Sequence, residues 1–253
     1  MNGSAASGPI GPLILSILLA VVPIILAITL HEAAHGYAAL AMGDDTARTA
    51  GRLSLNPLAH IDRVGTVLLP GFLLISQLLT IGHVAFMFGW AKPVPVAAWR
   101  FRRPRQGMMV VAAAGPAMNF LLAWLGALGL YLVPLLTGRP QDSLLTFLFY
   151  FMLANIALGL FNLLPIPPLD GGRIVVGLLP EALAQRWAKI ERGGLLIVLL
   201  LVVLLPQVLG AFGIAFNPIR ALLTDVADPV FRCLLFLAGN PSSANLLGGD
   251  SGA

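Results

Sequence analysis

Long apolar runs without any charged side chain divide this sequence of 253 residues. The first run occupies residues 1–30. Four further runs lack Asp, Glu, Lys and Arg, and they cover residues 64–91, 106–138, 143–169 and 193–219. A helix that crosses a bilayer needs about 20 mainly apolar residues, and each run is longer than that. The pattern therefore predicts a membrane protein with several spanning segments, and a weaker sixth candidate lies at 233–249.

Composition supports the same class. The chain is 58% hydrophobic and only 10% charged, and its mean hydropathy is +0.91, which is unlike a soluble domain of this length. The polar connections are too short to hold a separate domain. We therefore expect one all-α membrane domain over residues 1–253, with five to six transmembrane or re-entrant helices and flexible tails at 1–8 and 240–253. The single cysteine, Cys233, excludes an internal disulfide.

Basic residues in two connections predict the orientation of the helices between them. The basic residues are Lys92, Arg100, Arg102, Arg103 and Arg105 in one connection, and Arg173, Arg186, Lys189 and Arg192 in the other. Cytoplasmic loops carry an excess of Lys and Arg, so both connections are expected on the cytoplasmic side. The same bias explains the net charge of +4, and no nucleic-acid partner is expected. Residues 64–91 either span the membrane or re-enter it, because Pro70-Gly71 and Gly82-His83 permit a break.

The motif His31-Glu32-Ala33-Ala34-His35 continues the first apolar run. On a helix, histidines at i and i+4 share one face, where both can bind one zinc ion beside the glutamate. Ionisable side chains are costly at membrane depth and usually mark a functional site. We therefore predict that His31 and His35 are metal ligands.

A catalytic zinc site needs a third protein ligand and an open position for water. Asp170 is the best candidate, because it follows the run 143–169, where three prolines near the end prevent a regular helix. Gly171-Gly172 then allow a close approach of the backbone. Glu181 and Glu191 are weaker candidates, because they lie in a basic amphipathic stretch that is typical of an interfacial helix.

Three segments resemble the site-2 proteases, a family of zinc intramembrane peptidases. The segments are His31-Glu-Ala-Ala-His-Gly36, Ala114-Gly-Pro-Ala-Met-Asn119 and Asn162-Leu-Leu-Pro-Ile-Pro-Pro-Leu-Asp-Gly171. The intervening segments, Asn56 to Asp62 and Phe88 to Pro95, resemble the compact bacterial subgroup, which lacks a PDZ module. The resemblance covers roughly residues 10 to 205. It implies a three-helix catalytic core with short membrane-associated β segments.

The resemblance also implies the chemistry of the site. One zinc ion per chain, held by His31, His35 and Asp170, would lower the pKa of a bound water toward about 7. Glu32 would act as the general base toward that water and then pass the proton to the leaving amine. Asn162 is expected to donate a hydrogen bond to the oxyanion or to the substrate backbone. The alternative for Asn162 is a buried amide that joins two helices.

The segment from Gly89 to Val96 is expected to be extended, because Pro93 and Pro95 are incompatible with a helix. By resemblance, its residues could pair with an unwound substrate as an added strand. The candidate edge residues are Ala91, Lys92, Pro93 and Val94. A stiff loop that shields the metal is the alternative.

The expected function is zinc-dependent endoproteolysis in or near transmembrane helices, for regulated proteolysis or for removal of signal peptides and membrane remnants. Transmembrane proteins or peptides and the lipid bilayer are the expected partners, and a bacterial cytoplasmic membrane is the expected location. Two other functions remain open: a metal transporter and a catalytically silent scaffold. His60 and Asp62 are alternative metal binders or gate residues, although a hydrogen bond between them is the simpler interpretation. The sequence specifies neither the substrate nor the oligomeric state.

Overall fold

The structure is a computed structural model, which describes residues 10–80, 82–83 and 89–240. Its first half contains α1 (Ile10–Ala41), α2 (Thr46–Thr49), η1 (Pro57–His60), η2 (Arg63–Leu68), α3 (Leu69–Thr80), η3 (Ala98–Arg100), α4 (Pro104–Gly129) and η4 (Leu130–Leu135). Its second half contains α5 (Arg139–Asn162), α6 (Asp170–Leu178), α7 (Glu181–Lys189), α8 (Glu191–Leu199), η5 (Leu200–Leu204), α9 (Leu205–Ala211), α10 (Pro218–Ala221), η6 (Leu222–Ala227) and α11 (Asp228–Leu237). The η labels denote short 3-10 or π-helical turns.

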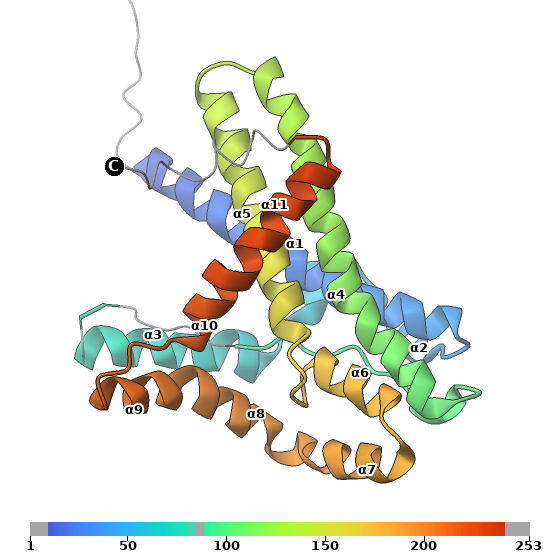
Figure 1. The fold of residues 1–253 in the computed structure, drawn as a ribbon. Coiled ribbons are helices and arrows are strands. Elements are labelled where there is room, and N and C mark those ends of the chain that lie inside the picture. Colours follow the sequence, from blue (N-terminus) through green and yellow to red (C-terminus); the bar gives the residue numbers. More distant parts are fainter. Residues whose placement is uncertain (1–9, 81, 84–88, 241–253) are drawn as a thin grey trace, which may run out of the picture.

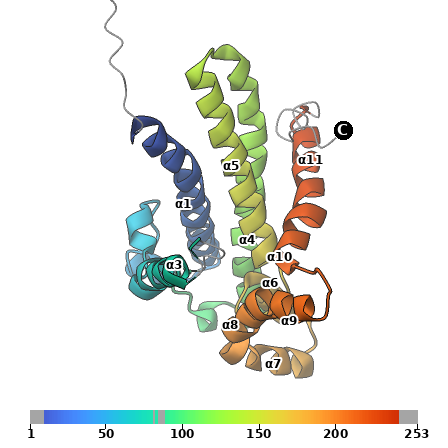
Figure 2. The same cartoon turned by 90° about the vertical axis from the view of Figure 1, so that its left-hand side faces the viewer.

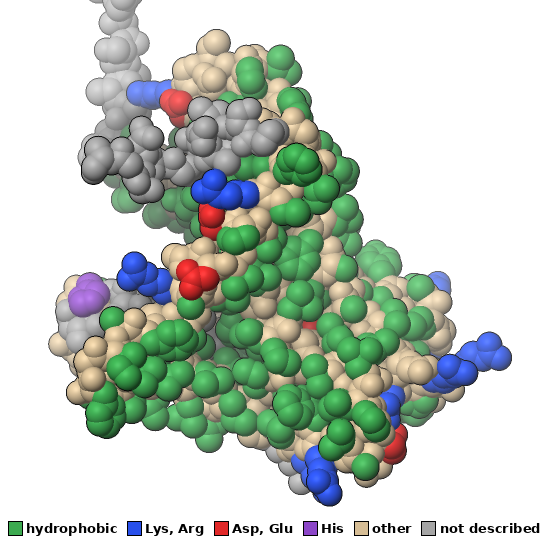
Figure 3. Space-filling view, viewed as in Figure 1, with side chains coloured by type: hydrophobic (Ala, Val, Ile, Leu, Met, Phe, Trp, Pro, Cys, Tyr) green, Lys and Arg blue, Asp and Glu red, His purple; other side chains and the backbone are tan. Residues whose placement is uncertain are grey.

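Four helices in the described part of the chain are long and apolar enough to cross a membrane. They are Ile10–Ala41, Arg63–Thr80, Pro104–Leu135 and Arg139–Asn162. Apolar side chains are spread over the whole described face seen in Figure 3, and charged side chains on it are few. The chain is therefore an all-α integral membrane protein, as predicted from the apolar runs.

Helices α4 and α5 run side by side, and α11 packs against both (Figures 1 and 2). Their contact is formed by small and medium apolar side chains, among them Ala127, Met152 and Leu235, which are fully buried. Small residues allow helix backbones to approach closely where lipid supplies no hydrophobic driving force. Helix α1 also contacts α4 and α5. Helices α1, α4 and α5 form the frame on which the candidate site is built.

Helix α3 runs across α4 and α5 rather than along them (Figures 1 and 2). Helices α3, α7, α8 and α9 all lie at the lower end of the molecule in these two views. The apolar run 193–219 forms α8, η5 and α9, whose apolar part, Leu196–Ala211, is shorter than a spanning helix. The helix ends there because Gly213 has a positive φ of 76° and turns the chain.

One expectation is not met within the described residues. No β-strand forms there, and residues 89–96, expected as an extended edge, belong to neither a strand nor a helix. The sixth candidate span, 233–249, begins inside α11, which ends at Leu237, and residues 241–249 of it lie outside the described residues. The tails expected at 1–8 and 240–253 lie outside the described residues, apart from residue 240. The single-domain organisation and the total number of spans stay predictions.

Candidate metal centre

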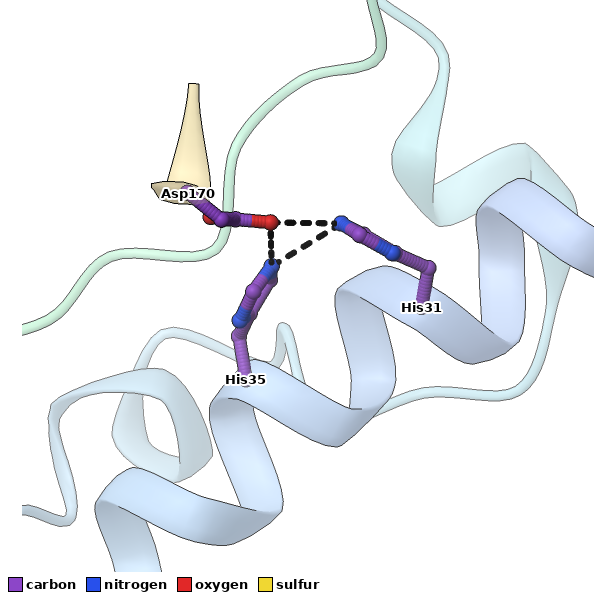
Figure 4. Close-up of side chains that lie close together, drawn as sticks. All are labelled: His31, His35 and Asp170. Carbon is purple, nitrogen blue, oxygen red and sulfur yellow. Dashed lines mark hydrogen bonds and ion pairs between the residues drawn. The ribbon is translucent and has the colours of Figure 1, made fainter. Parts of the chain in front are cut away.

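Three side chains of metal-ligand type meet at one point. His31 and His35 project from consecutive turns of α1, and Asp170 is the first residue of α6. Asp170 Oδ2 lies 3.1 Å from His31 Nε2 and 3.4 Å from His35 Nε2. The two Nε2 atoms are themselves 3.1 Å apart (Figure 4). The structure thus brings together the three residues predicted as metal ligands.

Hydrogen bonds on the far side of each imidazole determine which nitrogen faces Asp170. His35 Nδ1 lies 2.7 Å from the carbonyl oxygen of Val111, which can only accept, so Nδ1 carries the proton. His31 Nδ1 lies 2.5 Å from the side-chain oxygen of Asn119. The amide nitrogen of Asn119 donates elsewhere, so this oxygen is the acceptor. Each ring therefore turns the lone pair of its Nε2 toward Asp170.

This arrangement fits a cation. Asp170 Oδ2 is buried and receives no hydrogen bond, and the two Nε2 atoms beside it bring lone pairs rather than protons. Three electron-rich atoms so close together repel one another unless a positive ion lies between them. Imidazole nitrogen and carboxylate oxygen are ordinary zinc ligands, and anchoring of the second ring nitrogen is typical of metal-binding histidines.

Helix α4 approaches the two imidazoles at a residue without a side chain. A Cβ atom at Gly115 would lie 2.6 Å from His31 Cε1 and 2.5 Å from His35 Cε1. Val111 and Asn119, which contact the two Nδ1 atoms, lie four residues before and after Gly115. Residues spaced by four share one helix face. One stripe of α4 therefore positions both histidines.

Asp170 is placed by the irregular segment that separates α5 from α6. Helix α5 ends at Asn162, and the chain then passes through Pro165, Pro167 and Pro168 before α6 begins. A Cβ atom at Gly171 would lie 2.2 Å from the carbonyl oxygen of Leu163, so only glycine fits this approach. The turn delivers the carboxylate of Asp170 to α1.

Glu32 lies on the wall of an apolar cavity of about 590 Å³, which His31 also lines. Its Oε2 accepts a hydrogen bond of 3.2 Å from the backbone N–H of Val94. The cavity is also lined by Thr29, His31, Trp90, Ala91, Leu158, Phe161, Asn162 and Leu169. A carboxylate next to a metal centre and an apolar pocket can move a proton during hydrolysis of a bound chain.

Asn162 lines the same cavity but does not reach the three ligand atoms. Its amide nitrogen donates 3.0 Å to the carbonyl oxygen of Leu158, one turn earlier in α5. The expected contact with a substrate or an oxyanion therefore stays a prediction. This hydrogen bond stays within α5, so Asn162 does not join two helices by a side-chain hydrogen bond, which was the alternative interpretation.

The proposed edge residues are tied to neighbouring segments. The N–H of Lys92 donates to the carbonyl oxygen of His60 over 2.9 Å, and Arg52 donates to the carbonyl oxygen of Lys92 over 2.7 Å. Val94 is buried against Glu32, whereas Lys92 and Pro93 are exposed. The segment passes the candidate base but is not paired as a strand.

A buried carboxylate holds the far end of this segment. Asp44 has no exposed surface, and it accepts hydrogen bonds from the N–H of Ala97 over 2.6 Å and of Thr46 over 3.0 Å. Burial raises the pKa of Asp44, but the hydrogen bonds from Thr46 and Ala97 and the charge of Arg100 outweigh it and lower the pKa. Asp44 is therefore ionised and fixes Ala97 beside the end of α1.

We expect Asp44→Asn to destabilise the fold by about 1.5–3 kcal/mol, because an amide presents a donor where the carboxylate met donors. Since the pKa of Asp44 is lowered by folding, its contribution is present above about pH 4 and is lost as the pH falls through the folded-state pKa. Thermal unfolding in detergent as a function of pH measures both effects. Asp45→Asn, which removes an exposed partner of Arg100, should cost less than about 1 kcal/mol. Equal losses in the two variants would contradict the role of Asp44.

His60 and Asp62 take no part in the three-residue cluster. His60 Nε2 lies 2.8 Å from the carbonyl oxygen of Ser54. Asp62 accepts from the N–H groups of Val64 and Gly65 at the start of η2. The hydrogen bond expected between His60 and Asp62 is not observed: His60 Nε2 and the Asp62 carboxylate bind nearby backbone groups, and the buried Nδ1 of His60 has no hydrogen-bond partner among the described residues.

Two residues of the centre are not apparent from sequence reasoning. From the sequence, Asn119 is named only as the end of the segment 114–119 that resembles the family, without a role at the metal, and Asn155 is not singled out. Both are fully buried and hydrogen-bonded to each other over 2.9 Å. Both residues could have been found as polar amides within apolar helices of spanning length. A polar side chain in such a helix is costly unless its groups are paired, and it therefore indicates a functional site.

Comparison with known proteins agrees with this geometry. The sequence profile described as Peptidase family M50 matches residues 139–205, which include Asn162 and Asp170. The protein named "Putative zinc metalloprotease YwhC" from Bacillus subtilis is 37% identical over 190 residues, covering 72% of this chain and 79% of YwhC. The chain belongs to peptidase family M50. The expected site-2 protease family is thus confirmed.

Other relatives carry the same type of name. Rip2 of Mycolicibacterium smegmatis is 30% identical over 184 residues, which cover 71% of this chain and 64% of Rip2. Rip3 of Mycobacterium tuberculosis is 39% identical over 95 residues, which cover 37% of this chain and 21% of Rip3. No solved structure matches the chain. The M50 relationship makes this protein a zinc-dependent metalloprotease, with His31, His35 and Asp170 as the candidate zinc site.

Proposed function

We propose that this M50 metalloprotease is an intramembrane endopeptidase, which hydrolyses peptide bonds in or near the transmembrane helices of other proteins. The observation that carries the proposal is the position of the cluster of His31, His35 and Asp170. It lies between helices of membrane length and borders an apolar cavity that also contains Glu32. An apolar cavity of this kind suits a segment taken out of a bilayer better than a soluble, charged peptide.

In the proposed reaction, each polar residue has one task. His31, His35 and Asp170 hold the zinc, which when bound supplies a Lewis acid to polarise the scissile carbonyl and activate water. Glu32 accepts a proton from the attacking water at its carboxylate and returns it to the nitrogen of the leaving amine. The N–H of Val94 holds the carboxylate of Glu32 in place between these transfers.

A substrate helix must be opened before it can be cut, because its carbonyl groups are engaged in i→i−4 hydrogen bonds. Asn162, on the cavity wall, is proposed to bind the exposed backbone of the opened segment. Ala91, Lys92, Pro93 and Val94 are proposed as the edge along which that segment lies. The substrates are therefore transmembrane proteins or peptides, and the biological role is regulated proteolysis or removal of signal peptides and membrane remnants.

Purified protein tests this function directly. It should contain one zinc ion per chain and cut a membrane-helix substrate in detergent or liposomes. A metal transporter would instead move zinc into sealed vesicles and cut nothing. A silent scaffold would bind the substrate helix and leave it intact. Either result would contradict the proposed protease activity and support the other function instead.

We also propose a multi-pass topology in a bacterial cytoplasmic membrane, in which residues 43–63 and 92–106 share the cytoplasmic side. The two connections touch: Asp44 accepts from Ala97, and Arg52 donates to Lys92. In Cys233→Ser protein, single cysteines at Ser54 and Gln106 should therefore react with an impermeant thiol reagent from the same face of oriented vesicles. Labelling from opposite faces would contradict this topology and the re-entrant interpretation of 64–91.

A further inference from the structure

We propose that Asn155 is a positioning residue for the zinc ligand His31, although the two side chains do not touch. Asn155 lies on α5, and it acts through Asn119 on α4. Asn119 in turn contacts His31 on α1. The chain of amides thus joins the three helices that surround the centre.

The orientation of the Asn119 amide is determined by its two acceptors. Its Nδ2 donates to the side-chain oxygen of Asn155 over 2.9 Å and to the carbonyl oxygen of Ala27 over 3.3 Å. Its Oδ1 is left facing His31 Nδ1 at 2.5 Å. Because Asn119 has no exposed surface, no bulk water can replace these partners.

Asn155 is oriented by its own helix. Its Nδ2 donates over 2.8 Å to the carbonyl oxygen of Phe151, one turn earlier in α5. Its Oδ1 must then face Asn119, and Asn155 is likewise fully buried. The backbone carbonyl of Phe151 therefore determines the orientation of both side-chain amides, Asn155 and then Asn119. Burying an amide group without a hydrogen-bond partner is costly, so the reversed orientation is disfavoured.

The orientation of the two amides matters because it selects the tautomer of His31. With Asn119 Oδ1 as acceptor, the proton stays on Nδ1 and the lone pair stays on Nε2, where the metal needs it. If the Asn119 amide turned over, its NH₂ group would face Nδ1. The proton would then move to Nε2 and block metal ligation. Asn155 prevents this turn by offering only an acceptor to Asn119.

Metal affinity and histidine spectroscopy test the inference. We expect Asn155→Leu and Asn119→Leu to weaken cobalt and zinc binding about 10–100-fold in chelator competition. The visible spectrum of the cobalt-loaded protein should also change. Only four histidines are present, so NMR of histidine-labelled protein can follow the Nδ1 proton of His31, which should be lost in Asn119→Leu. Asn155→Asp keeps an oxygen for Asn119 and should restore binding. If Asn155→Leu does not fold, Asn155→Ala replaces it.

Met152→Ala is the matched control. Met152 is fully buried on α5, close to Asn155 in sequence, and packs against α4 without entering the chain of amides. It should lower the melting temperature and leave metal affinity and the cobalt spectrum unchanged. Wild-type affinity in a folded Asn155→Leu protein would overturn the inference, as would an equal loss of affinity in Met152→Ala.

The inference rests on the proposed ligation by His31, His35 and Asp170, but the two can fail separately. A wild-type protein without zinc would overturn the ligand assignment. A wild-type protein with zinc, together with unchanged binding in Asn155→Leu, would overturn only the role of Asn155.

Discussion

Glu32→Gln is expected to abolish cleavage while leaving zinc in place. The amide of Gln has nearly the same shape as the carboxylate and can still accept a hydrogen bond from the N–H of Val94. It cannot take a proton from water, and loss of a general base typically costs about 10²–10⁴-fold in rate. Zinc analysis together with the initial rate on a membrane-helix substrate measures both parts of the prediction.

The substrate should remain bound to Glu32→Gln, because the cavity and the edge residues are unchanged. Co-purification with a tagged substrate helix would reveal such a complex. Glu191→Gln is the matched control, since this exposed glutamate pairs with Arg173 over 2.9 Å and lies outside the cavity. It should cut at the wild-type rate. A Glu32→Gln enzyme that also cut at the wild-type rate would remove Glu32 from the proposed mechanism.

The two histidines were predictable because their relation is local. An i, i+4 spacing on a helix places two side chains on one face whatever the rest of the fold does. Asp170 lies more than a hundred residues away, and sequence reasoning reached it only through the proline-rich segment before it and the resemblance to a family. The structure places the carboxylate of Asp170 beside the histidines because Gly171 permits a close approach of the backbone, and its role as a ligand stays a prediction.

Contacts that support these ligands could not be predicted in the same way. The side chains of Asn119 and Asn155 meet because α4 and α5 pack at one particular register, and no local pattern determines that register. Asp44 is similar: it looks like a residue of an exposed turn, yet it is completely buried under Ala97. Tertiary packing decides such positions.

The helices themselves followed the apolar pattern where nothing interrupted it. The run 106–138 contains most of α4 and η4, and 143–169 contains most of α5. The run 193–219 was long enough for a span, but backbone conformation ended the helix at Ala211, before Gly213. Charge-free length indicates where a helix can lie in the membrane, but it does not determine where the helix stops: α9 ends before Gly213, whereas α1 and α4 continue through Pro23 and Pro116.

Asp170→Asn is expected to remove most of the bound zinc. The substitution keeps the shape of the side chain but replaces one of only three protein ligands by a neutral, weaker donor. Loss of an outer hydrogen-bond partner typically weakens a metal site about 10–100-fold, and loss of a direct ligand should exceed that. Chelator competition followed by metal analysis of the folded protein measures the change. Asp142→Asn, an exposed aspartate near the start of α5, is the control and should bind zinc as the wild type does. Full zinc content in Asp170→Asn would exclude Asp170 as a ligand and direct the search to His60 and Asp62.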